Sequence, residues 1–244
     1  MLFCVGCQWQ LRSGDNGNGN LHISIERYDR LEQNFLTSGD VSALQQMNTE
    51  YSVQTRTLIE DVLRIGHIDE PDISSRFISF FQDSTLQTLM TDVQKQYADM
   101  SDIEKELTDA FERLTNMIPT LLTPHVYTQI GSLDQSIVVG DRLLGISLDK
   151  YLGADYPVYM RYGYTEKQRT MMTRDFIVPD CLSFYLLSLY PFTDEAQVNM
   201  HMARIQYVVN KVTGRHIFND ENVKAVEAYV SSNPDISTDE LLSN

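Results

Sequence analysis

The chain has 244 residues, of which 42% are hydrophobic and 10% aromatic, so it is long enough and apolar enough to bury a sizeable core. Its 34 acidic and 19 basic side chains give a formal net charge of -15, and the basic residues form no compact run. Because nucleic-acid binding depends on clustered Lys and Arg that neutralise phosphates, this balance argues against a nucleic-acid partner.

The N-terminus predicts a membrane anchor. Gly6 directly precedes Cys7 after a short apolar stretch, as at the cleavage site of a bacterial lipoprotein signal peptide, so we expect a lipid on the thiol of Cys7. Residues 8–20 (QWQLRSGDNGNGN) are rich in Gly and Asn and predict a flexible tether. The other interpretation is an unstructured N-terminus in which Cys4 and Cys7 are incidental thiols. Attachment to a membrane is expected through lipid only, because no later apolar run reaches the roughly 18 residues of a spanning helix.

Residues 21–244 are expected to form one folded domain behind the signal remnant and tether at residues 1–20. Alternating apolar and polar side chains predict a short strand at Leu21–Glu26. Apolar stripes at helical spacing then predict several helices, with a compact apolar knot at Ser74–Phe81. The predicted helices are Ser38–Met47, Thr49–Ile65 and Thr85–Tyr97.

The clearest predicted helix is Asp102–Ile118, which Pro119 ends. Ser101 and Glu104 have the spacing of a capping box at its start. Its apolar side chains recur at steps of three and four residues and should form one buried face. These side chains are Ile103, Leu107, Phe111, Leu114 and Ile118.

Three short apolar segments separated by Gly and Asp follow this helix. They predict a small antiparallel β-meander at His125–Ile130, Ser136–Val139 and Leu143–Leu148. The pattern as a whole predicts an α+β fold that is mainly helical, with a single domain and one small sheet.

Further helices are predicted beyond the sheet. Thr165 and Gln168 have the spacing of a capping pair, and Pro179 suits the first position of a buried helix. Gly214 suits the end of a long amphipathic helix. The predicted ranges are Asp180–Tyr190, Asp194–Thr213 and Glu221–Ser231.

The sequence contains no recognisable catalytic or cofactor motif. A zinc peptidase of the HExxH type needs two His one helical turn apart, and no two of the five His lie within four residues. The GxGxxG, Walker A and GxSxG motifs are also absent. His67, Asp69 and Glu70 have the residue types of metal ligands, although a polar turn explains them at least as well. Cys181 lies on an apolar helix and is expected to be a buried, inert thiol. We therefore predict no catalytic residue, no metal and no cofactor.

The segment Ile146–Tyr159 (ISLDKYLGADYPVY) has the strongest functional signal, because it is denser in Asp, Tyr and Gly than a core strand or surface helix requires. Five Tyr occur between Tyr151 and Tyr164. A Tyr ring with a polar tip suits recognition of a peptide or a glycan. The alternative is a covering loop whose rings pack over the small sheet, and both interpretations stay open.

The chain resembles the GldB-type gliding-motility lipoproteins of the Bacteroidota from about Ile23 to Gly214. The order and spacing of several short segments carry the resemblance, above all residues 148–159 (LDKYLGADYPVY). The other segments are residues 25–29 (IERYD), 81–83 (FQD), 103–119, 124–128 (PHVYT) and 176–180 (FIVPD).

This resemblance implies a lipid-anchored cell-envelope protein, at the outer membrane and facing the periplasm, with no established enzymatic activity. Members of the family in gliding bacteria are linked to motility and its secretion machinery. The resemblance also implies a distant similarity to zinc-peptidase domains, in which residues 179–190 correspond to the HExxH helix and lack both His. The body is therefore expected to be peptidase-like but degenerate.

The favoured interpretation is a non-catalytic protein that binds a partner protein or an envelope polymer. The expected binding residues are Asp149, Tyr151, Tyr156, Tyr159 and Asp180. Two alternatives stay open: a hydrolase that uses Asp149 or Asp180 as acid or base with an unrecognised metal, and a glycan-binding module that uses Tyr151–Tyr164. The sequence does not predict the oligomeric state.

Overall fold

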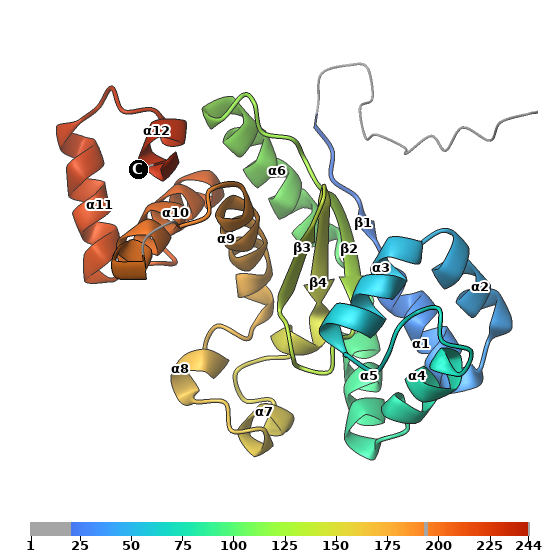
Figure 1. Cartoon of the computed structure of the whole chain (residues 1–244). Coiled ribbons are helices and arrows are strands. Elements are labelled where there is room, and N and C mark those ends of the chain that lie inside the picture. The colour runs from blue at the N-terminus through green and yellow to red at the C-terminus, as the bar shows by residue number, and fades with distance from the viewer. Residues whose placement is uncertain (1–20, 193–194, 244) are drawn as a thin grey trace, which may run out of the picture.

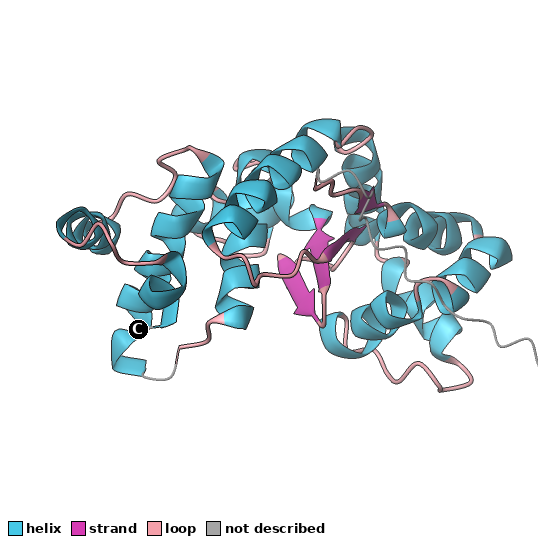
Figure 2. Cartoon of the chain, turned by 90° about the horizontal axis from the view of Figure 1, so that it is seen from above, coloured by secondary structure: helices cyan, strands magenta, loops and turns pink. Residues whose placement is uncertain are grey.

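The computed structural model describes residues 21–192 and 195–243, and it shows a mainly helical α+β body with one small sheet (Figure 1). The sheet lies in the middle, between the N-terminal helices and the C-terminal helices (Figure 2). Within the described residues, no helix combines the length and the hydropathy needed to cross a membrane. The predicted lipid site Cys7 and the predicted tether lie outside the described residues.

The N-terminal helices include one that the sequence analysis missed, α1 (Tyr28–Ser38). Three polar side chains of α1, those of Asp29, Glu32 and Gln33, are buried, so its core-facing side does not appear as an apolar stripe. The following elements are α2 (Val41–Thr49), α3 (Ser52–Arg56) with its π-helical continuation η1 (Thr57–Val62), α4 (Ile73–Phe81) and α5 (Ser84–Gln96). Helix α4 is the predicted apolar knot.

Helix α6 (Ser101–Met117) confirms the predicted apolar stripe, because Ile103, Leu107, Phe111 and Leu114 are all buried. The predicted capping box is wrong. The carboxylate of Glu104 accepts a hydrogen bond from the backbone N–H of Ile25 at 2.8 Å instead of turning back to its own helix. The side chain of Glu104 thus ties α6 to the first strand of the sheet.

The four strands are β1 (Ile25–Glu26), β2 (His125–Gln129), β3 (Ile137–Gly140) and β4 (Leu143–Ser147), in the order β1-β2-β4-β3. The strand pairs β1/β2 and β2/β4 are parallel, and only β3 and β4 are antiparallel. The predicted antiparallel meander is therefore wrong, because the sheet is mixed and β4 inserts between β2 and β3.

The burial of each strand explains this order. Four of the five residues of β2 and of β4 are buried, whereas β3 has one buried residue and ends exposed. Strands covered on both faces take central positions, and the less buried strand takes an edge. Gly145 of β4 leaves room for the ring of Tyr127 from β2, because a Cβ at position 145 would approach that ring to 2.5 Å.

The chain after the sheet is helical. The elements are η2 (Leu148–Tyr151), α7 (Pro157–Arg161), α8 (Glu166–Arg169), η3 (Arg174–Phe176), α9 (Ile177–Leu189), η4 (Glu195–Gln197), α10 (Val198–Thr213), α11 (Glu221–Ser232) and α12 (Thr238–Ser243). The capping pair Thr165 and Gln168 is confirmed, as is the left-handed Gly214 at the end of α10. Helix α9 begins at Ile177, so Pro179 is its third residue and not its first.

The degenerate peptidase-like body that the resemblance implied is not supported by this architecture. The mainly helical α+β class is confirmed. Cys181 on α9 is fully buried and unpaired, and burial raises its pKa well above the ordinary range, as expected for an inert thiol.

Candidate functional site

The Tyr-rich segment leaves the end of β4, continues through η2 and reaches α7, so it lies at the carboxyl end of the central strands. Asp149 in η2 is completely buried. Its Oδ1 accepts the backbone N–H of Gly131 at 2.8 Å, and its Oδ2 accepts that of Leu133 at 2.5 Å. Asp149 therefore holds the loop that leads from β2 to β3.

The pKa of Asp149 is raised by burial, although the hydrogen bonds from Gly131 and Leu133 oppose the rise. A carboxylate that already accepts two backbone hydrogen bonds inside the protein has no path to a substrate in this arrangement. Its environment is that of a structural group.

Tyr159 of α7 is also completely buried, and its hydroxyl completes a second set of backbone contacts. The hydroxyl donates to the carbonyl of Asp149 at 2.6 Å and accepts the N–H of Leu152 at 2.8 Å. These two bonds fix α7 against η2. The ring of Tyr156 meets the ring of Tyr159 edge to face at 5.2 Å between centroids.

Tyr151 connects η2 to the first turn of α9. Its ring is 1% exposed, and its hydroxyl donates to Oδ2 of Asp180 at 2.8 Å. Burial raises the pKa of Asp180 to about 6, and the hydrogen bond from Tyr151 opposes that rise. The backbone carbonyl of Tyr151 accepts from the hydroxyl of Tyr97, the C-cap residue of α5, at 2.5 Å.

The five predicted binding residues are thus brought together, but three of them are core residues. Asp149, Tyr151 and Tyr159 do not line an open surface, and that part of the prediction is wrong. Their hydroxyl and carboxylate groups contact backbone or one another. Tyr156 is half-buried and donates to Asp92 at 2.8 Å. A binding role for this set stays a prediction, and the geometry supports the covering-loop interpretation.

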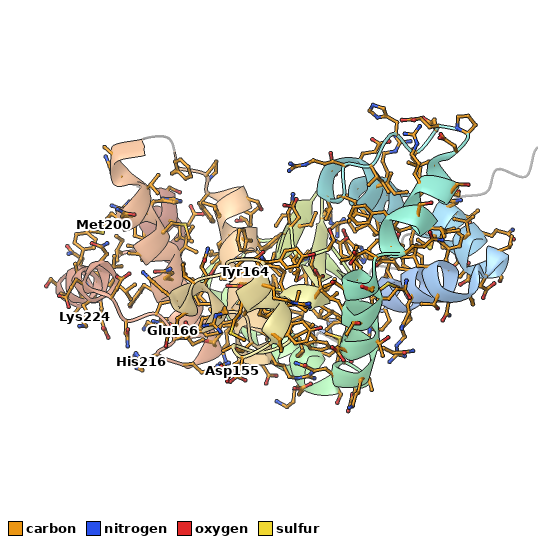
Figure 3. The ribbon with its side chains drawn as sticks, turned by 90° about the horizontal axis from the view of Figure 1, so that it is seen from below. Asp155, Tyr164, Glu166, Met200, His216 and Lys224 are labelled. Carbon is orange, nitrogen blue, oxygen red and sulfur yellow. The ribbon has the colours of Figure 1, made fainter. Side chains whose placement is uncertain are left out.

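The later part of the same region, around Tyr164, is less buried; Figure 3 labels this residue in a view from below. Tyr164 is half-buried and donates to the carbonyl of Leu133 at 2.7 Å, while the ammonium of Lys150 lies 4.4 Å from the centre of its ring. Tyr162 is 55% exposed. Both rings line a shallow hollow of about 430 Å³ together with Arg64.

A buried carboxyl group that the sequence did not single out lies at the end of β2. Glu32 of α1 is fully buried, and its Oε2 accepts the N–H of Ile130 at 2.9 Å, whereas its Oε1 has no hydrogen-bond partner among the described residues. Burial raises the pKa of Glu32 well above its usual range, and the charges of Asp149 and Asp29 raise it further. The neutral form is therefore favoured. No sequence signal marks Glu32, because its helix has the polar composition of a surface helix.

The described residues contain no group of three or more His, Cys, Asp or Glu arranged to hold a metal ion. His201, the only His classed as buried within the described part, lies 2.6 Å through Nε2 from the carbonyl oxygen of Tyr190. The group at His67 and Glu70 is a polar turn, in which Glu70 accepts the N–H of His67 at 2.7 Å.

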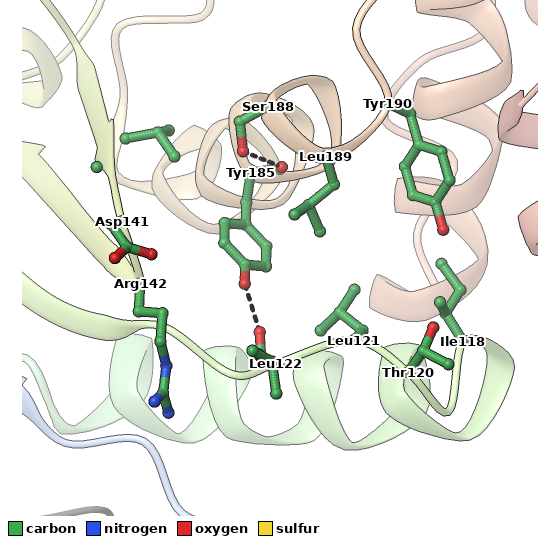
Figure 4. Close-up of a pocket in the computed structure, with 12 residues that line it drawn as sticks. Ile118, Thr120, Leu121, Leu122, Asp141, Arg142, Tyr185, Ser188, Leu189 and Tyr190 are labelled. Carbon is green, nitrogen blue, oxygen red and sulfur yellow. Dashed lines mark hydrogen bonds between the residues drawn. The ribbon is translucent and has the colours of Figure 1, made fainter.

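A groove of about 650 Å³ lies at the β3–β4 turn, at the opposite end of β4 from Asp149, and beside the end of α9 (Figure 4). It is lined by residues from 118–122 after α6, from 139–142 at the β3–β4 turn, and from 185–190 of α9. The ring of Tyr185 forms part of the groove floor, and its hydroxyl donates a hydrogen bond to the carbonyl of Leu122. Sequence analysis missed this groove because its three walls are far apart in the chain.

The groove is bordered by apolar side chains that reach solvent. Leu122 is 59% exposed and Leu189 is 46% exposed. Exposed apolar groups gathered around a cavity are typical of a binding surface. The apolar residues at the end of the predicted helix Asp180–Tyr190 were the one available signal in the sequence.

Comparison with known proteins identifies one family. The family model described as "Gliding motility protein GldB" matches residues 15–214, about four fifths of the chain, and includes the sheet, the Tyr-rich segment and α9. The resemblance seen in the sequence is thereby confirmed. No curated protein and no solved structure matches significantly.

Proposed function

Since this chain belongs to the family of GldB-type gliding-motility lipoproteins, we propose that it works at the cell envelope as a non-catalytic protein that binds a partner protein. The family match supports a gliding-motility lipoprotein in the envelope. We also propose that a lipid on Cys7 anchors the protein at the outer membrane, with its body and the bound partner in the periplasm.

The geometry of the acidic residues supports a non-catalytic role. A hydrolase would need Asp149 or Asp180 within reach of a substrate. Asp149 accepts two backbone hydrogen bonds in the core, and Asp180 accepts the hydroxyl of Tyr151. Both carboxyl groups are thus occupied in holding η2, α9 and the β2–β3 loop together.

The observation that carries the binding role is the groove between α9 and the β3–β4 turn, with Leu122 and Leu189 exposed at its rim. Transfer of apolar surface out of water favours association by roughly 25 cal/mol per Å². An apolar rim suits a protein better than a polysaccharide, whose surface carries mostly hydroxyl groups. Among the five Tyr from Tyr151 to Tyr164, only Tyr162 is largely exposed, so these rings offer a weaker platform for a glycan.

The test is site-specific photo-crosslinking in cells that express the full chain. A photoreactive amino acid replaces Leu189 or Leu122 at the groove, and replaces Val53 of α3 as the control. Val53 is 56% exposed, which matches the groove positions in accessibility. We expect discrete adducts with an envelope protein from Leu189 and Leu122 and none of the same size from Val53.

Adducts that are equal at all three positions, or that are absent from the groove positions, would contradict protein binding at the groove. Adducts with glycan from Tyr162 but no protein adducts at Leu189 would instead support the glycan-binding alternative.

A further inference from the structure

Strand β3 forms one edge of the sheet, and one hydrogen bond shows which of its residues bond to β4. Ile137 pairs with Ile146, so Ser136, just before β3, lies opposite Ser147. The N–H of Ser147 donates to the carbonyl of Ser136 at 2.9 Å, which makes this a hydrogen-bonded pair. In an antiparallel ladder, pairs that exchange hydrogen bonds alternate with pairs that do not. The backbone groups of Val138 therefore face β4, and those of Ile137 and Val139 face away from the sheet.

These outward groups have no partner in the part of the chain that the structure describes. No hydrogen bond from residues 21–192 or 195–243 reaches the N–H or C=O of Ile137 or Val139. Two residues thus offer two donors and two acceptors in a row. An unpaired edge of this kind is a template for the backbone of another extended chain.

The open edge runs into the groove. Val139 and Gly140 both line the groove and form one of its walls. Across from this wall stand the ring of Tyr185 and the side chain of Leu189, as Figure 4 shows. A strand laid along β3 would project alternate side chains toward this apolar floor, because successive side chains in a strand point to opposite faces.

The end of the groove carries balanced charge. Asp141 and Arg142 are neighbours in the β3–β4 turn, and both line the groove (Figure 4). Two adjacent opposite charges give no preference for a partner of either sign. The selection of side chains at this groove therefore depends on its apolar residues.

We propose that the groove binds an extended segment of a partner polypeptide as an added strand on β3, with an apolar side chain over Tyr185. This inference rests on the proposed binding function and specifies the partner's chemistry. The backbone of Ile137 and Val139 supplies hydrogen bonds to an added strand, and the apolar residues of the groove select its side chains.

The test uses a display library of random ten-residue peptides, selected on the purified full chain. Val139→Pro removes the outward N–H and keeps the pairing with β4, a position at which proline is tolerated in an edge strand. Val139→Thr is the matched control, because it has a similar shape and keeps the N–H. We expect selected peptides to bind Val139→Pro roughly tenfold more weakly than the native chain and Val139→Thr within about threefold.

A further measurement makes the test independent of the folding of a variant. Methylation of alternate amide nitrogens of a selected peptide should abolish its binding to the native chain when those amides face β3, and methylation of the other set should not.

Strand addition is wrong if the library yields no binders, or if binders are insensitive both to Val139→Pro and to amide methylation. Groove-specific photo-adducts from Leu189 that persist unchanged in Val139→Pro would also overturn strand addition while leaving the proposed function intact. A dimer of the native chain that Val139→Pro dissociates would show that the occupant is a second copy, which overturns the choice of a partner polypeptide.

Discussion

The carboxyl group of Asp180 makes the buried network around Tyr151 measurable through pH. The substitution Asp180→Asn keeps the shape of the side chain and an oxygen that can accept from Tyr151, but it removes the titrating group. Any dependence on pH that disappears with this substitution belongs to Asp180.

The magnitude follows from the pKa of Asp180, which burial raises from 3.8 to about 6. Because the native state then binds the proton more tightly than the unfolded chain, the stability that protonation contributes is complete below pH of about 4 and is lost as the pH rises to about 6 and beyond. Each pH unit between the two pKa values changes the free energy of unfolding by roughly 1.4 kcal/mol. The total decrease in the free energy of unfolding is therefore about 2 to 3 kcal/mol.

The assay is urea unfolding of the native chain and of Asp180→Asn from pH 4 to pH 8. We expect the free energy of unfolding of the variant, minus that of the native chain, to increase by about 2 to 3 kcal/mol over this range. Subtraction removes the titration that is common to the other carboxyl groups. Asp155→Asn, at an exposed position, controls for the loss of one negative charge. A difference between Asp180→Asn and the native chain that stays flat with pH would refute the reasoning.

Three further predictions concern packing, the tyrosine contacts and the anchor. Phe111→Ala should lower the free energy of unfolding by about 3 to 5 kcal/mol, because the ring is completely buried in α6, and a loss below about 1 kcal/mol would show that the helix is peripheral. Tyr159→Phe should lower the free energy of unfolding by about 2 to 4 kcal/mol, because it leaves the N–H of Leu152 and the carbonyl of Asp149 without their partner. The control Tyr162→Phe, at an exposed ring, should change the free energy of unfolding by less than about 0.5 kcal/mol. Equal losses in the two variants would contradict this assignment. Cys7→Ser should abolish incorporation of labelled fatty acid and release the protein from the membrane fraction, and a variant that still carries label would contradict a lipid on that thiol.

The sequence by itself determined the helical elements with a regular apolar period. Helix α6 is the clearest case, because its apolar side chains recur every three or four residues and need only one partner surface. The caps at Thr165 and Gly214 were also predictable, since hydrogen bonds within a few residues fix them. Helix α1 was not predictable in this way, because Glu32 and its polar neighbours are buried by contacts from strands about 100 residues later in the chain.

Only the tertiary structure decided the sheet order and the nature of the Tyr-rich segment. The register between β2 and β4 joins segments separated by the whole of β3, and no local pattern distinguishes a parallel neighbour from an antiparallel one. The same holds for Asp149, whose carboxylate is buried because the backbone of Gly131 and Leu133 folds over it. A sequence records which groups can form hydrogen bonds, but only the folded chain determines whether those bonds go to solvent, to a ligand or to its own backbone.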